Sequence, residues 1–251
     1  MLPALSRRMG VVPGLSLAET QTRADELGLG APVAIRVNPR ARRLLLRMDA
    51  ATRRFDLVLP QGLPAETALK FLEAQRGWIA ARLDALPAAV PFAEGAVVPV
   101  FGVPHPIRRE DDPAAPLVAI VNGEIRVRGG PEPVARRVRD HLARLAAREL
   151  ARRARLHATT IGVKVTRITV RDTKSRWGSC SVAGSLSFSW RLVMAPEPVL
   201  DYVVAHEVAH LVEMNHGPRF WKLVRAMVDD PAAQRAWLRR QRADRLSYGC
   251  A

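Results

Sequence analysis

Alternation of apolar and polar residues predicts short strands in the first part of the chain. Val33–Val37 reads as one strand, and in Arg43–Met48 leucine and methionine alternate with polar residues at a period of two. That period is typical of a strand with one buried face. Phe55–Leu59 follows a polar turn and is expected to pair with the second strand.

Helical spacing of apolar residues marks two longer segments. Between Pro64 and Pro87 the spacing predicts one helix, with Pro64 in its first turn, where proline is tolerated. A longer helix is predicted from Pro131 to about Thr159, and its polar face is rich in arginine. This face is either simply solvated or a surface that contacts phosphates, and the pattern leaves both interpretations open.

Three further strands are expected between these helices, in a region with many prolines. They are Val97–Phe101, Leu117–Val121 and Ile125–Val127, joined by turns such as Asn122–Gly123. Gly129–Gly130–Pro131 is the best candidate for a domain boundary. The sequence therefore predicts an α+β protein, with a small strand-rich domain with one helix over residues 1–130 and a second domain of helices on a small sheet over 131–251.

The candidate chemistry lies in the second domain, after expected strands at Thr166–Val170 and Leu186–Trp190. A helix is predicted from Pro196 or Pro198 through Leu211, and it contains the run His206-Glu-Val-Ala-His210. Residues four apart lie on one helix face, so both imidazoles can reach one Zn²⁺ while Glu207 leans toward a metal-bound water. Zinc lowers the pKa of such a water from about 15.7 toward roughly 7, and a carboxylate can take its proton.

A catalytic zinc usually has three protein ligands and one open position, and His216 is the preferred third ligand. It lies too far along for the same helix face, so the helix is expected to end near Met214 or Asn215. Asn215 and Gly217 are expected to form a left-handed bend there. Glu213 is the rival ligand, three residues after His210. Further helices are expected to begin at Pro218 and Pro231.

Composition adds limits to this picture. The formal net charge is +15, and the basic residues are almost all arginine, which allows non-specific contact with nucleic acid. Cys180 and Cys250 are too few for a disulfide framework, so a reducing cytoplasm is expected. No apolar run is long enough to span a membrane, and Met1–Gly14 makes no convincing signal peptide. The remaining histidines, His105, His141 and His157, are interpreted as surface residues.

Several motifs together resemble a known family, the bacterial YgjP-type metal-dependent hydrolases, which are relatives of the SprT-like metalloproteases. The motifs are Arg176-Trp-Gly-Ser-Cys180, Leu186-Ser-Phe-Ser-Trp-Arg-Leu192, Met194-Ala-Pro196, Tyr202-Val-Val204, His206-Glu-Val-Ala-His210, Glu213-Met-Asn-His216 and Pro218-Arg-Phe-Trp221, within Lys174 to Trp221. The resemblance implies a zincin-like catalytic domain with His206, His210 and His216 as zinc ligands and Glu207 as the catalyst. The chain lacks the metzincin glycine between His210 and His216, and no zinc-ribbon cysteines follow.

Substrate contacts are hypotheses at this point. Arg176–Cys180 could form or flank an edge strand that pairs with an extended substrate, and Trp177 either packs under the metal helix or contacts substrate. Arg176 and Arg191 are candidates for stabilising an oxyanion. The sequence thus predicts a zinc-dependent hydrolase, with a metallopeptidase acting on peptides or proteins first. A nucleotide phosphohydrolase and a nucleic-acid-associated adaptor with a structural zinc are the alternatives.

Overall fold

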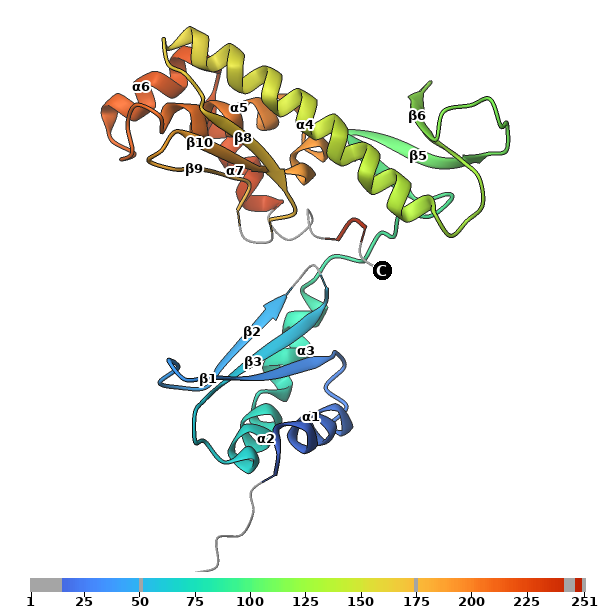
Figure 1. Ribbon diagram of the computed structural model, residues 1–251, viewed down its shortest axis with the longest axis vertical. Coiled ribbons are helices and arrows are strands. Elements are labelled where there is room, and N and C mark those ends of the chain that lie inside the picture. Colours follow the sequence, from blue (N-terminus) through green and yellow to red (C-terminus); the bar gives the residue numbers. More distant parts are fainter. Residues whose placement is uncertain (1–14, 50–51, 174–175, 242–246, 250–251) are drawn as a thin grey trace, which may run out of the picture. The chain divides into compact units, whose positions relative to one another are not determined.

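The computed structural model describes residues 15–49, 52–173, 176–241 and 247–249. It divides into two compact units, Met1–Leu86 and Pro87–Ala251, each drawn in Figure 1. Met1–Gly14, Lys174 and Cys250, which entered the sequence analysis, lie outside the described residues. The structure is a mixed α+β arrangement of helices and small sheets, so the predicted fold class is confirmed at this level.

The first unit contains a three-stranded sheet in the order β1-β3-β2, with β1 parallel and β2 antiparallel to β3. The strands are β1 (Val33–Asn38), β2 (Leu45–Asp49) and β3 (Arg54–Pro60). One face of this sheet packs on the helices, because Ile35 and Leu57 share a hydrophobic core with residues of all three helices. The alternation predicted from sequence therefore identified the buried face.

The helices of this unit differ from the prediction. They are α1 (Leu17–Glu26), α2 (Ala65–Ala74) and α3 (Arg76–Asp84). Helix α1 was not predicted, although Ser16 and Glu19 form a capping box at its start. The single helix expected between Pro64 and Pro87 is broken at Gln75, whose φ of −90° and ψ of 2° leave the α-helical region.

The second unit begins with a four-stranded sheet in the order β4-β5-β7-β6. Its strands are β4 (Val97–Val100), β5 (Val103–Glu110), β6 (Val118–Val121) and β7 (Glu124–Arg128). Strand β5 was missed because Pro104 and Pro106 suggested turns. Both prolines lie in the half of β5 that pairs with β4 alone, and only the following residues pair with β7, so the missing N–H groups are tolerated.

The division between the units lies at Leu86–Pro87 and not at the glycine pair before Pro131. The reason is helix α4 (Val134–Thr160), which was predicted almost to the residue. Its residues Val134 and Val138 belong to the same hydrophobic core as Ile107 and Val127 of the four-stranded sheet. Because this sheet and the helix share one core, residues 87–130 belong with the second unit.

The remainder of the second unit carries the candidate chemistry. A second sheet has the order β8-β10-β9, with strands Arg167–Arg171 (β8), Gly178–Cys180 (β9) and Ser185–Ser189 (β10). A 3₁₀ turn, η1 (Trp190–Met194), then leads into α5 (Glu197–Ala209), α6 (Pro218–Met227) and α7 (Pro231–Arg240). Among the described residues, no helix has the length and apolar character needed to cross a membrane.

A buried polar cluster joins α4 to α5. Arg153 contacts Glu197 at 2.8 Å and Asp201 at 3.5 Å, and His157 Nε2 lies 2.9 Å from Asp201 Oδ1. The prediction that His157 is a surface residue is wrong, since its side chain is buried here. His105 is likewise buried, within β5. The partners of Asp201 lower the pKa of its carboxyl although burial alone would raise it.

We expect Asp201→Asn to lower the free energy of unfolding by about 1–3 kcal/mol at pH 7, because it removes the charged acceptor shared by Arg153 and His157. The folded-state pKa of Asp201 is depressed, so its contribution is present above the unfolded value and is lost as pH falls through the folded value. The difference between wild type and variant in urea unfolding should therefore shrink below about pH 4.

Asp140→Asn is the matched control. Asp140 pairs with Arg139 at 3.4 Å on the exposed side of α4, the helix that carries Arg153 and His157. An exposed pair contributes at most about 1 kcal/mol, so this variant should stay close to wild type. Equal losses in the two variants would mean that the cluster at Asp201 adds nothing specific.

Candidate metal centre

Three histidines converge where α5 ends. His206 lies in the last turn of α5, His210 is its C-cap residue, and His216 lies in the loop just before α6. One ring nitrogen from each of the three lies within 4.8 Å of the others. The structure thus brings together the three side chains that the sequence selected.

The spacing of the rings suits a metal ion. Nε2 of His206 and Nε2 of His216 are 3.1 Å apart. Two imidazole nitrogens in a tetrahedral shell with Zn–N distances of about 2.0–2.1 Å are separated by about 3.3 Å. No fourth His, Cys, Asp or Glu joins the group among the described residues, which leaves one coordination position open.

Neighbouring groups orient the rings. His210 Nδ1 donates to the carbonyl oxygen of Glu213 at 3.0 Å, which leaves its Nε2 as a lone-pair donor. His206 Nδ1 lies 3.3 Å from the Tyr202 hydroxyl. Phe220, fully buried at the start of α6, packs against all three histidines with ring centroids 4.6–4.9 Å away. The sequence analysis assigned no role to Phe220.

Burial and mutual repulsion favour the neutral imidazoles of His206 and His210, and metal ligands must be neutral. Burial lowers the pKa of His206 to about 3, with further lowering from His210, His216 and Arg235. Burial also lowers the pKa of His210. Neutral rings at ordinary pH are therefore a property of the folded chain itself.

Burial affects Glu207 in the opposite sense, because it raises the pKa of the carboxyl to about 7 while Arg176 opposes the rise. Among the described residues no donor forms a hydrogen bond to this carboxylate. Its side chain packs on the backbone of β9, where a Cβ at Gly178 would lie 2.6 Å from Glu207 Cγ. Only glycine fits here, and a glycine inside a strand is typical of such a close approach.

The bend before His216 differs from the prediction. Helix α5 ends at Ala209, earlier than the expected Met214 or Asn215, and a tight turn of backbone hydrogen bonds follows. Neither Asn215 nor Gly217 has a positive φ, and Gly217 is extended, with φ −80° and ψ −175°. Glu213, the rival ligand, contributes its carbonyl oxygen to His210 while its carboxylate accepts from Asn215 N.

The three substrate-binding candidates occupy different surroundings. Arg176 is exposed and lies close enough to Glu207 to lower the pKa of its carboxyl. Arg191 is buried, and Asp172 accepts from its Nε at 2.8 Å and from its terminal nitrogen at 3.3 Å. Asp172 thus balances the charge of Arg191, and a role of Arg191 as an oxyanion donor stays a prediction.

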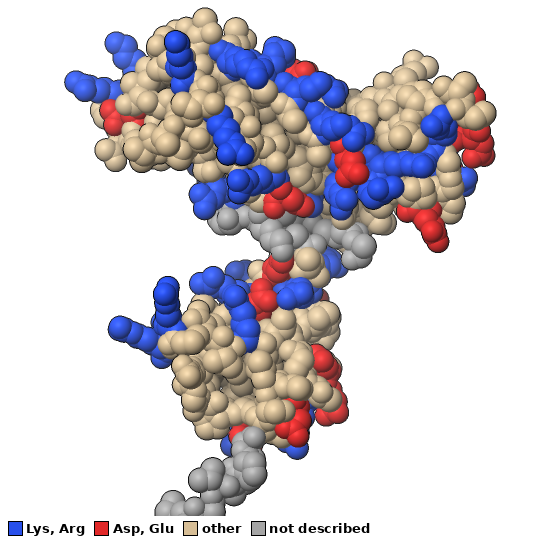
Figure 2. All heavy atoms as spheres, viewed as in Figure 1, with Lys and Arg blue, Asp and Glu red and all other residues tan. Residues whose placement is uncertain are grey.

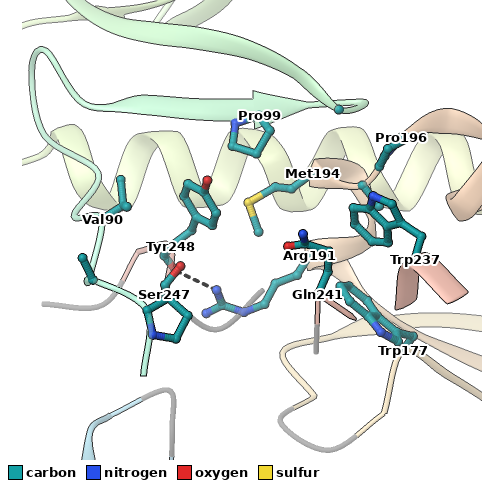
Figure 3. A pocket seen from close by; sticks show the side chains of 14 residues that line it. Val90, Pro99, Trp177, Arg191, Met194, Pro196, Trp237, Gln241, Ser247 and Tyr248 are labelled. Atoms are coloured by element: carbon teal, nitrogen blue, oxygen red, sulfur yellow. Dashed lines mark hydrogen bonds between the residues drawn. The ribbon is translucent and has the colours of Figure 1, made fainter. Parts of the chain in front are cut away.

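Trp177 and Arg191 both line a cavity of about 390 Å³ within the second unit, which also carries the three histidines (Figure 3). Its other walls include Met194 and Pro196 before α5, and Trp237 of α7. Trp177 directly precedes Gly178, which contacts Glu207. The cavity therefore adjoins the carboxylate through β9. The sequence analysis did not single out Trp237.

Helix α7 also connects this cavity to the histidines. Two residues before Trp237, Arg235 stacks over the ring of Trp221 at 4.7 Å. Trp221 in turn donates its Nε1–H to the carbonyl oxygen of His216 at 3.0 Å. The segment Trp177–Gly178 and helix α7 thus connect the cavity to the candidate metal centre.

The chain is similar to a family of known proteins and, weakly, to a solved structure. The crystal structure of the metallopeptidase zymogen of Pyrococcus abyssi abylysin is similar at 18% identity and a TM-score of 0.34, covering 41% of this chain and 99% of that one. No curated protein sequence matches the chain. A family model described as YgjP-like, metallopeptidase domain, matches residues 42–241. Since that match extends over well more than half of the 251 residues, the chain belongs to the YgjP-like metallopeptidase family.

Proposed function

We propose that the protein is a zinc-dependent peptidase in which His206, His210 and His216 hold the cation and Glu207 is the general base. The observation that carries this proposal is the convergence of three imidazoles beside a buried carboxylate that has no hydrogen-bond partner among the described residues. Three nitrogen ligands and one open position are typical of catalytic zinc, whereas a structural zinc usually has four protein ligands.

A bound cation would supply Lewis-acid chemistry, acidifying a water and polarising the carbonyl of the substrate. Glu207 takes the proton of the attacking water at a carboxylate oxygen while the water oxygen bonds to the carbonyl carbon. Glu207 then delivers this proton to the leaving amine as the C–N bond breaks. Arg176 favours the charged form of Glu207, which is the form that accepts the proton.

The substrate is proposed to bind along β9. This strand is an edge of the β8-β10-β9 sheet, and an extended peptide can add to such an edge through main-chain hydrogen bonds. A peptide aligned there passes Gly178, which faces Glu207, and reaches Trp177 at about 3.3 Å per residue. The cavity of Trp177, Met194 and Trp237 then receives one bulky apolar side chain of the substrate.

A nucleotide phosphohydrolase and an adaptor with a structural zinc are the competing functions. Separate panels of peptides and nucleoside triphosphates, each with wild type and Glu207→Gln, distinguish them. Peptide cleavage supports the proposal. Cleavage of nucleotides alone, or of neither substrate, contradicts it.

We expect about one zinc per chain in the purified protein, and its loss in His206→Ala, His210→Ala and His216→Ala. Elemental analysis of each variant is the measurement. Glu213→Ala is the control, because only the backbone carbonyl of Glu213 contacts a ligand. Full occupancy after His216→Ala together with loss after Glu213→Ala would reverse the assignment of the third ligand.

Glu207→Gln should retain zinc and the melting temperature of wild type while turnover falls by about 10²–10⁴-fold, the usual size of a lost general base. The amide keeps the shape of the side chain beside Gly178 and removes only the proton acceptor. Zinc content, melting temperature and peptide hydrolysis are measured on one preparation. Near-normal turnover in a zinc-loaded variant would remove Glu207 from the mechanism.

Trp237→Ala should lower kcat/KM about tenfold for peptides with a large apolar residue beside the cleaved bond, since lost pocket contacts cost about 1–3 kcal/mol. The same variant should cleave peptides with alanine at that position at nearly the wild-type rate. Kinetics on the two peptide series are the measurement. An equal loss on both series would mean that the cavity does not select the side chain.

A further inference from the structure

Five arginines line one groove on the first unit, far along the sequence from the histidines. The groove has a volume of about 320 Å³, and its arginines come from β1, from the loop after it and from β2. They are Arg36, Arg40, Arg42, Arg43 and Arg47. Figure 2 shows basic side chains projecting around the loop that joins β1 and β2.

Among the described residues, no acidic side chain lines this groove. None of the five arginines forms a salt bridge with a described residue, although Asp56 lies across from Arg47 in the strand register. The carboxylate of Asp56 instead pairs with Arg54 at 3.3 Å. The groove therefore concentrates positive charge without an internal counter-charge.

A local turn holds the loop arginines in place. Asn38 ends β1, its carbonyl accepts from Ala41 N at 3.0 Å, and its side-chain oxygen accepts from Arg40 N at 2.9 Å. Pro39 occupies the second position of this turn, where its fixed φ is favoured. The backbone that carries the loop arginines is thus fixed by its own hydrogen bonds.

The floor of the groove is apolar. Val58 of β3 lies between Arg36 of β1 and Leu45 of β2 in the strand register. These residues lie on the sheet face opposite to Ile35 and Leu57, which pack on the helices. Val58 and Leu45 also line the groove, so an apolar strip is bordered by guanidinium groups.

We propose that this groove binds single-stranded nucleic acid. The guanidinium groups contact phosphates, and a sugar or an unstacked base lies over Val58 and Leu45, where arginine can also stack on it. A cationic rim around an apolar floor fits a single strand, which exposes its bases, better than a duplex, which hides them. Release of counterions from the strand supplies the favourable free energy.

The second basic surface of the chain provides a matched control. Arg144, Arg148 and Arg155 of α4 also lack salt bridges to described residues, and Figure 2 shows basic side chains along this helix. They follow one helix face, and of the three only Arg155 lines a groove. Two triple variants each remove three charges from the formal +15. The groove variant is Arg36→Gln/Arg42→Gln/Arg47→Gln, and the α4 variant is Arg144→Gln/Arg148→Gln/Arg155→Gln.

The experiment measures binding of fluorescent dT20 to the full chain by anisotropy at several salt concentrations, with a 20-base-pair duplex in parallel. We expect the groove variant to bind dT20 at least about tenfold more weakly than wild type and to reduce the slope of log K against log salt by about 2. The α4 variant should change much less, and wild type should prefer dT20 to the duplex.

Melting temperature and zinc content should match wild type in both variants, since none of the six arginines lies at the candidate metal centre. Equal losses in the two variants would show that only net charge matters and would overturn the proposal. Binding that prefers the duplex, or that is unaffected by the groove substitutions, would overturn it as well.

Discussion

The candidate metal centre depends on the burial of helix α5. Nine of its residues are buried, and it contacts α4, η1, α6, α7 and β9. A helix that is apolar all round has no solvent-facing side on which polar groups could be placed at low cost. Its polar residues therefore meet partners in neighbouring elements, as Asp201 does at α4, while His206 and His210 face the turn that follows the helix.

Burial also determines how the third histidine, His216, joins His206 and His210. Helix α5 stops at Ala209, and α6 starts eight residues after His210 with Phe220 packed beneath all three rings. The third histidine thus approaches from the far side of a turn that is stabilised by its own backbone hydrogen bonds. The packing that buries Phe220 also orients the imidazoles, so the hydrophobic core and the candidate site depend on the same contacts.

The sequence predicted elements with a strong period and missed those that depend on tertiary pairing. Helix α4 and the strands of the first sheet follow directly from apolar spacing. Strand β5 could not be recognised, because its prolines are tolerated only where one neighbour is absent, and this is a property of the sheet. For the same reason His157 looked like a surface residue, since its partner Asp201 is 44 positions away.

The candidate site follows the same rule. The spacing of His206 and His210 on one helix is local information, so the sequence predicted their approach, and the bend that brings in His216 was expected although its conformation was wrong. Contacts across the chain were not accessible: the approach of Gly178 to Glu207 joins a strand to a helix 29 positions later.

Burial acts on the imidazole and the carboxylate of the candidate site in opposite directions, lowering the pKa of His206 and raising that of Glu207. Arg235 reinforces the effect of burial on the imidazole, whereas Arg176 counters it on the carboxylate. A positive surrounding thus favours the two forms that metal-assisted hydrolysis requires, a neutral ligand and a charged base.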